Sequence, residues 1–368
     1  ISTNIKDEDL TTIAEKSIRS GLRVGLVTTS SLTDATPAAF LTHVSVRSCE
    51  GPQEVMGTFY YGVEQPACLP DSRENGGAGS IAEQLVDSQA YVLLGGGSKF
   101  FSQQTVDGEA VFQRAARQGF QIVTSKSQLN DVDLSSPLLG TFDDETLEVR
   151  WQGEGGRSAE SAVKSWSHAL SDYLGKVEQP EPMHCQPNPE YGETPSMAEM
   201  TQTALNLLEY NNERGFFLMV ESASIDKQSH SRNPCGSIGE IAQLEEVLLI
   251  ALEYAARQPD TLVIVTADHA QAAQIVPEPS LYHRNPFPTY SPGLVARIHT
   301  PEGGLMRINY ATNNLFSEEH TGANVPIFSN DVGREWLRPF MRQREIHDAM
   351  LGFLLGPDNV QYKPSTSQ

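Results

Sequence analysis

The sequence predicts an α/β fold with a mostly parallel central sheet and helices on both faces. Short runs that are continuously apolar and β-branched are typical of strands covered on both sides. These runs alternate along the chain with segments of helical periodicity, as in parallel sheets whose strands are joined by helices. Of the 368 residues, 39% are hydrophobic, which is enough for the core of one large domain. We therefore expect a single domain over residues 1–368.

Six runs are predicted strands, and five segments are predicted helices. In chain order the strands are residues 24–27, 90–94, 121–124, 216–220, 262–266 and 325–328. The helices are residues 9–20, 80–87, 194–210, a long segment around 241–255 and residues 344–355. In the long segment, Ile241, Leu244, Leu248, Ala251, Leu252 and Ala255 form one apolar face. Residues 176–192 and 277–292 are rich in proline without periodicity and are expected to be surface excursions.

The charge of the chain excludes two classes of partner. Its formal net charge is −21, with 47 acidic and 26 basic residues, so its field repels nucleic acids and anionic membranes. No apolar run approaches the length of a membrane span. The basic residues comprise 8 Lys and 18 Arg. This acidic, lysine-poor composition is typical of a halophilic protein, and also fits an ordinary acidic secreted protein.

Four cysteines, Cys49, Cys68, Cys185 and Cys235, are scattered along the chain without a Cys-x-x-Cys pair. Their spacing does not suit a structural zinc site. An even number of scattered cysteines indicates two disulfides and an oxidising compartment. Sequential pairing, Cys49–Cys68 and Cys185–Cys235, is the simplest of three connectivities. Four buried free thiols are the alternative.

Polar residues follow three of the predicted strands, where ligands bind to parallel sheets. They are Asp34 and Thr36 after the first strand, Glu221, Asp226, Lys227 and His230 after the fourth, and Asp268 and His269 after the fifth. Asp226 and His230 are four residues apart, so one helical turn places both on the same face. A carboxylate and an imidazole on one face suit zinc, and a further histidine would complete a three-ligand site. Downstream, His320 adds another histidine in a loop. A single histidine is more often structural, but Asp/His pairs at two strand ends favour a metal site.

Four segments in order resemble the alkaline phosphatase family. They are Asp34-Ala35-Thr36-Pro37 with Arg47 following, Glu221-Ser222-Ala223-Ser224-Ile225-Asp226-Lys227-Gln228 ending at His230, Thr266-Ala267-Asp268-His269, and Glu319-His320-Thr321-Gly322. The resemblance extends from about residue 7 to residue 355. It is strongest to the bacterial periplasmic branch, which pairs an Asp in the first motif with a Lys in the second, as Asp34 and Lys227 do here.

The resemblance implies a role for each matching residue. Asp226, His230 and His320 would bind a first Zn²⁺, Asp268 and His269 a second Zn²⁺, and Thr36 and Glu221 one Mg²⁺. Arg47 would hold two phosphate oxygens. Asp34 and Lys227 would bind waters near the phosphate and the magnesium. Arg47, Lys227 and the metal ions would together supply the positive pocket that an acidic protein needs for an anionic substrate.

The resemblance also implies an activity. Two zinc ions would hold the attacking and leaving oxygens during phosphoryl transfer, through a phosphoserine intermediate and at alkaline pH. The substrates would be small phosphate monoesters, with inorganic phosphate as product. The protein would be a periplasmic or secreted homodimer.

The sequence departs from the family in two respects. The family's serine lies in an Asp-Ser-Ala motif, which neither Asp71-Ser72 nor Asp87-Ser88 reproduces. We therefore expect the chain to lack the serine, one ligand of the second zinc and one magnesium ligand. It would be part of a longer protein, a metal-binding fragment without turnover, or an enzyme with a substitute nucleophile. Gln271 stands where similar relatives carry a histidine that supports the first zinc site.

Related phosphodiesterases and sulfatases share the metal ligands of this superfamily, and they are the alternative enzymatic interpretation. They lack the combination of Asp34, Thr36 and Arg47. A metal-binding protein without enzymatic activity is the second alternative, and it rests on the absent serine alone.

Overall fold

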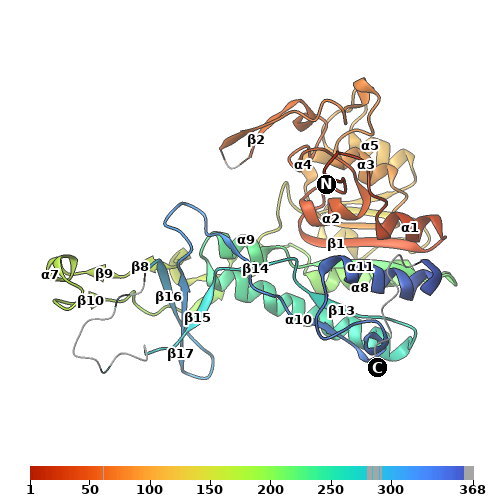
Figure 1. Cartoon of the computed structure of the whole chain (residues 1–368). Coiled ribbons are helices and arrows are strands. Elements are labelled where there is room, and N and C mark those ends of the chain that lie inside the picture. Colours follow the sequence, from red (N-terminus) through yellow and green to blue (C-terminus); the bar gives the residue numbers. More distant parts are fainter. Residues whose placement is uncertain (61, 280–283, 285–289, 291, 360–368) are drawn as a thin grey trace.

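A five-stranded parallel sheet, in the right half of Figure 1, is the largest sheet among the described residues. The computed structural model describes residues 1–60, 62–279, 284, 290 and 292–359. In spatial order the strands are β12 (Phe216–Glu221), β1 (Arg23–Ser31), β4 (Val92–Gly96), β6 (Leu138–Thr141) and β5 (Gln121–Val123). All four neighbouring pairs run parallel, which confirms the predicted fold class. The sequence missed β6, a four-residue strand interrupted by glycine.

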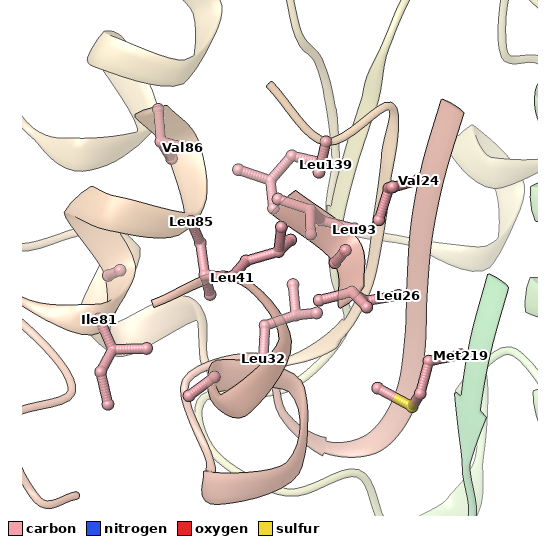
Figure 2. Packing of buried hydrophobic residues seen from close by; sticks show 14 of the residues in the cluster. Val24, Leu26, Leu32, Leu41, Ile81, Leu85, Val86, Leu93, Leu139 and Met219 are labelled. Carbon is pink, nitrogen blue, oxygen red and sulfur yellow. The ribbon is translucent and has the colours of Figure 1, made fainter. Parts of the chain in front are cut away.

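Helices cover both faces of this sheet, because successive strand residues point to opposite sides. Val24 and Leu26 belong to one buried cluster, and Val27 lies in the other. The first cluster includes residues of α1 (Ile13–Arg19), α2 (Ala35–Leu41), α3 (Ile81–Asp87), α4 (Ser98–Phe101), α5 (Val111–Arg117) and α11 (Gln343–Leu355). The second includes residues of α6 (Lys126–Leu129), α8 (Met197–Glu209) and α10 (Pro234–Arg257). Figure 2 shows the first cluster, where Leu26, Leu32, Leu85 and Leu93 are fully buried.

The helix boundaries follow from capping rather than from the apolar pattern. Thr12, Ser80 and Ser196 each accept a hydrogen bond from the backbone N–H three residues later, and a glutamate at that position closes a capping box. The predicted starts near residues 9 and 194 were therefore a few residues too early. The predicted long helix extends back to Pro234, with Asn233 as its cap.

A second group of strands lies to one side of the central sheet, to the left in Figure 1. Its four-stranded antiparallel sheet has the order β15 (Gln274–Val276), β17 (Leu305–Tyr310), β16 (Leu294–His299) and β8 (Glu160–Ser161). Around it are α7 (Trp166–Leu170) and the two-stranded pairs β9 (Val163–Lys164) with β10 (Val177–Glu178) and β7 (Trp151–Gly153) with β11 (Cys185–Pro187). The predicted excursion at 176–192 thus contains two short strands. Most of the excursion at 277–292 lies outside the described residues.

Several other elements are short. They include the pair β2 (Thr58–Tyr60) with β3 (Val63–Gln65), the pair β14 (Ala270–Gln271) with β18 (His320–Thr321), and helix α9 (Ser224–His230). Single 3-10 turns lie at Glu54–Met56, Arg73–Asn75, Glu154–Gly156, Pro189–Tyr191, Asp331–Glu335 and Pro357–Asn359. No described helix is long and apolar enough to cross a bilayer.

Two predicted strands lie outside the parallel sheet. They correspond to β13 (Ile264–Thr266) and β19 (Ile327–Ser329), which pair with each other in antiparallel fashion. A groove of about 2670 Å³ lies along the outer edge of β12, and β13 lines it as well. We call it the β12 groove. The predicted apolar face of α10 contributes Leu244, Leu248 and Ala251 to its wall. An apolar run therefore identified the strand but could not place it in the sheet.

Candidate functional site

All ten residues that the sequence predicts for catalysis or metal binding line the β12 groove. They are Asp34, Thr36, Arg47, Glu221, Asp226, Lys227, His230, Asp268, His269 and His320. The carboxyl ends of β1, β12 and β13 all lead into this groove. Parallel strands such as β1 and β12 place ligand-binding residues at such ends, whereas β13 reaches the groove from its antiparallel pair with β19. The fold thus brings together residues from four distant segments of the chain.

Asp226, His230 and His320 form the tightest cluster of possible metal ligands in the described part of the chain. One donor atom from each lies within 4.8 Å of the others. Asp226 Oδ2 is 3.2 Å from His230 Nε2, and Asp226 Oδ1 is 3.5 Å from His320 Nε2. The two Nε2 atoms lie 2.9 Å apart. Helix α9 brings Asp226 and His230 onto one face, and the β14–β18 pair brings His320 beside them.

The surroundings of this cluster prepare it for a cation. His230 Nδ1 lies 2.5 Å from the carbonyl oxygen of Glu318, which can only accept, so Nδ1 donates and Nε2 keeps its lone pair in the neutral ring. Gln271 Nε2 donates to Asp226 Oδ1. Burial raises the pKa of Asp226, but the hydrogen bonds that Asp226 accepts from Gln271 and from His230 in its protonated form outweigh it and lower that pKa to about 2. The carboxylate is therefore ionised at all physiological pH values.

The pKa values of the two histidines in this cluster are shifted in opposite directions. The hydrogen bond to Asp226 raises the pKa of His230, and this outweighs the opposing effect of burial. Burial and the neighbouring charge of His269 lower the pKa of His320. A metal ion must displace any proton from a histidine ligand, so metal binding here strengthens with rising pH.

Asp268 and His269 lie next to this cluster but do not close a second one. His269 Nε2 is 3.2 Å from Asp268 Oδ2, and the His269 and His320 ring centroids are 3.7 Å apart. The Asp268 side chain is 71% exposed. His269 Nδ1 is buried and has no hydrogen-bond partner among the described residues. An unpartnered buried nitrogen costs free energy unless something binds it, which a metal ion would do.

Asp34 connects the two positively charged side chains of the site. Its Oδ1 accepts from Arg47 Nη2 at 2.7 Å, and its Oδ2 accepts from Lys227 Nζ at 2.5 Å. Asp34 also caps α2 by accepting from the Ala35 N–H. Burial raises the pKa of Asp34, but the Lys227 charge and hydrogen bond, with Ala35 and Arg47, hold it below its usual value. Asp34 therefore holds the Arg47 and Lys227 side chains at the groove.

Thr36 and Glu221 meet on the same side of the groove. Glu221 accepts a hydrogen bond from Thr28 Oγ1 at 2.6 Å and another from the Thr36 hydroxyl. Burial is the main reason that the pKa of Glu221 is raised. A buried carboxylate with hydroxyl neighbours is favourably neutralised by a hard cation, for which these oxygen ligands are suitable.

Both disulfides of the sequential pairing are present. Cys49 is bonded to Cys68, and Cys185 is bonded to Cys235. The first closes the segment that follows Arg47, and the second ties the start of α10 to β11. Sequence reasoning missed the residues that support the site, above all Arg232 and Glu318, because neither belongs to a motif.

The comparisons with known proteins agree with this geometry. A family model described as alkaline phosphatase matches residues 1–314. The chain belongs to the alkaline phosphatase family. It is 40% identical over 335 residues to an alkaline phosphatase of Escherichia fergusonii, and 39% identical to that of Escherichia coli. Each alignment covers 89% of this chain and 64% of the relative, so the chain spans less than two thirds of these relatives' length.

A further relative has a more specific name. The streptomycin-6-phosphate phosphatase of Streptomyces griseus is 38% identical, over 87% of this chain and 66% of that protein. Among solved structures, the alkaline phosphatase of the Antarctic bacterium TAB5 shares the fold with a TM-score of 0.65 at 19% identity, covering 96% of this chain and 78% of that one. A cold-active alkaline phosphatase of Shewanella sp. has a TM-score of 0.52 at 26% identity, covering 75% and 51%. A variant of the TAB5 protein is described with bound Mg.

Proposed function

We propose that this member of the alkaline phosphatase family hydrolyses phosphate monoesters at a site with two zinc ions and one magnesium ion. The observation that carries the proposal is the convergence of Asp226, His230 and His320 beside Arg47 and Lys227 in one groove. A three-ligand Asp/His site with nearby cationic side chains suits metal-assisted phosphoryl transfer. The alkaline phosphatases and the streptomycin-6-phosphate phosphatase among the relatives support the same substrate class.

The ligands divide by chemistry. Asp226, His230 and His320 would hold the first zinc, and Asp268 and His269 the second. Thr36 and Glu221 supply only oxygen and would hold magnesium. When bound, these ions would neutralise charge on the attacking and leaving oxygens. In the first zinc site one donor atom from each of three ligands lies within 4.8 Å of the others, and in the second His269 Nε2 lies 3.2 Å from Asp268 Oδ2.

The chain's own side chains bind and orient the phosphate. The Arg47 guanidinium is a fork that can hold two phosphate oxygens while Asp34 Oδ1 keeps it in place. Lys227 adds a second positive charge from the last turn of α9, on the opposite oxygen of Asp34. Because Arg47 is half exposed, it can reach a substrate in the groove without a backbone movement.

The proposal also concerns the nucleophile. The family resemblance implies a phosphoserine intermediate, yet residues 1–368 contain no Asp-Ser-Ala motif. We propose that the serine, and the further aspartate that bridges two of the metals, belong to polypeptide beyond this sequence. The alternative, a chain that binds zinc without turnover, follows from the same observation. Two disulfides support a periplasmic or secreted location. A homodimer and adaptation to high salt remain parts of the proposal.

A substrate panel tests the proposal. The protein, together with the polypeptide proposed to carry the serine, is loaded with zinc and magnesium and assayed at alkaline pH against an aryl phosphate monoester, an aryl phosphate diester and an aryl sulfate. We expect release of phosphate from the monoester alone, and its loss in Arg47→Ala. Preference for the diester or sulfate would overturn the proposed substrate class. Stoichiometric zinc binding without any phosphate release would favour the fragment without turnover.

A further inference from the structure

Arg232, two residues after the candidate ligand His230, has an unusual backbone conformation. Its φ of 54° lies in the left-handed region, which side-chain-bearing residues rarely adopt. Such a conformation persists only where surrounding contacts hold it. Here the backbone is fixed on both sides, because Arg232 N–H donates to Ser229 and the Arg232 carbonyl accepts from Ala159 N–H. The turn directs the Arg232 side chain into the loop that precedes His320.

The Arg232 guanidinium forms a buried ion pair with Glu318. Its Nε is 2.7 Å from Glu318 Oε2, and the two side chains are only 7% and 0% exposed. Nη1 donates to the Leu315 carbonyl at 2.9 Å, and Nη2 reaches both the carbonyl and the side-chain oxygen of Asn313. The other Glu318 oxygen accepts from the Thr312 backbone N–H and hydroxyl. Both carboxylate oxygens of Glu318 therefore have hydrogen-bond partners.

The loop at 311–319 depends on this pair for its conformation. It joins β17 to β18, and its two large apolar side chains point to solvent, with Leu315 67% and Phe316 80% exposed. The loop thus has no apolar anchor of its own. Glu318 is its one buried residue. Polar contacts to Arg232 take the place that core packing has elsewhere in the molecule.

The same pair connects two candidate metal ligands. The Glu318 backbone N–H donates to the His230 carbonyl at 2.9 Å, and His230 Nδ1 donates to the Glu318 carbonyl at 2.5 Å. Glu318 therefore fixes both the position and the tautomer of His230. His320 follows two residues later and enters the β14–β18 pair opposite Gln271. Displacing Glu318 would move His320 and release His230 together.

We propose that the Arg232–Glu318 ion pair is a positioning device that holds His230 and His320 in ligand geometry before a metal ion binds. The inference rests on the proposed metal site and adds residues that no motif of the chain contains. Neither side chain touches the metal ligands' donor atoms, so both are positioning residues. Substitution of residues that orient metal ligands typically lowers metal affinity by about 10- to 100-fold.

Two conservative variants test the proposal, Arg232→Met and Glu318→Gln. Zinc affinity is measured by competition with a chromophoric chelator, and the geometry by the visible spectrum of the Co²⁺-loaded protein. We expect a loss of zinc affinity of about 10- to 100-fold in each, with partial recovery in Arg232→Lys. The double variant should lose little more than either single one, because both remove the same pair.

A second, partly buried pair provides the control. Arg297 and Glu278 lie 3.0 Å apart, with 19% and 13% exposure, and Arg297 lies on β16 in the antiparallel sheet. Arg297→Met and Glu278→Gln should leave zinc affinity within about twofold. An equal loss in both pairs would attribute the effect to general destabilisation and overturn the proposal. Unchanged zinc affinity in folded Arg232→Met would also overturn it.

Hydrogen exchange of the metal-free wild-type protein keeps the test independent of variant folding. The amides of Thr312 and Glu318 should exchange slowly without metal, because both donate hydrogen bonds within this network. Exchange of both at unprotected rates would overturn the proposal. If the wild type binds no zinc at all, the proposed function fails, whereas zinc binding without protection refutes only the positioning role.

Discussion

The two sides of the β12 groove support their candidate ligands differently. On the side of the parallel sheet, the ligands lie at the ends of strands that are paired over several residues. On the opposite side, they lie at or after very short pairs of strands. β1 and β12 pair at six positions, the last of which is Glu221 opposite Thr28, and Asp34 follows the end of β1 by three residues. β14 and β18, which present His320, pair at only two. The exposed fraction differs accordingly, being 18% for the Asp34 side chain but 46% for His320 and 71% for Asp268.

This difference shows two ways of placing a ligand. Parallel-sheet hydrogen bonds and two buried clusters fix the sheet side without help from the ligands themselves. The opposite side relies on individual polar contacts, such as Arg232 with Glu318 and Gln271 with Asp226. We therefore expect metal binding to order the opposite side more than the sheet side.

The largest expected effect is on zinc affinity, when His230 is removed. This candidate ligand follows β12 on the sheet side and is hydrogen-bonded to Glu318 on the opposite side. His230→Ala should reduce zinc affinity by more than about a hundredfold, since even residues that only orient ligands change it by 10- to 100-fold. Isothermal titration of the metal-free protein measures this directly. His299→Ala, on β16, serves as the control and should bind zinc normally. Normal zinc binding by His230→Ala would remove the basis for the comparison.

Core truncations measure how firmly each side is built. Leu93→Ala, in fully buried β4, should lower the free energy of unfolding by about 2–5 kcal/mol. Val265→Ala, in β13, should cost less than about 1.5 kcal/mol, because this side chain is only partly buried. Urea unfolding of both variants gives the two values. Equal losses would contradict the distinction between a packed and a loosely supported side.

Glu50 provides a pH test of the sheet side. Burial, opposed by a hydrogen bond from Thr33, raises the pKa of Glu50 from 4.5 to about 7. Because the folded state prefers the protonated acid, its stabilising contribution is complete below pH 4.5 and is lost as pH rises through about 7. This loss amounts to about 3 kcal/mol in the free energy of unfolding.

Glu50→Gln keeps an acceptor for Thr33 but cannot ionise, so the variant should be more stable than the wild type at pH 8 and similar at pH 4.5. Denaturant midpoints at the two pH values measure the difference. Glu74→Gln, at an exposed position, is the control and should leave the pH dependence unchanged. A pH dependence that persists in Glu50→Gln would assign it to another group.

The smallest expected effect concerns Gln271. Gln271→Ala removes the hydrogen bond to Asp226 and should weaken zinc binding by about tenfold, without unfolding the protein. Titration with a competing chelator is sensitive enough for this change. Gln274→Ala, three residues along on β15, should have no effect. If both variants bind zinc alike, the amide does not support the carboxylate.

Much of the site was predictable because its residues lie in short local motifs. Asp34, Asp226 and Asp268 each follow an apolar run that is itself recognisable. The ends of the parallel strands β1 and β12 meet in space, which places Asp34 and Asp226 together. The disulfide pairing was also predicted, as the simplest of three connectivities. The four-residue strand β6 was missed, because so short a run carries little periodic signal.

The sequence by itself determined the fold class, six of the strand runs and the residues at the strand ends, and it favoured the cysteine pairing that is present. Local apolar patterns and motif order carry that information. Only the tertiary structure decided that β13 pairs with β19 outside the parallel sheet, and that Arg232 meets Glu318 across 86 positions of the chain. Neither contact leaves a local pattern, because strand partners and buried ion pairs are selected by what else the fold brings within reach.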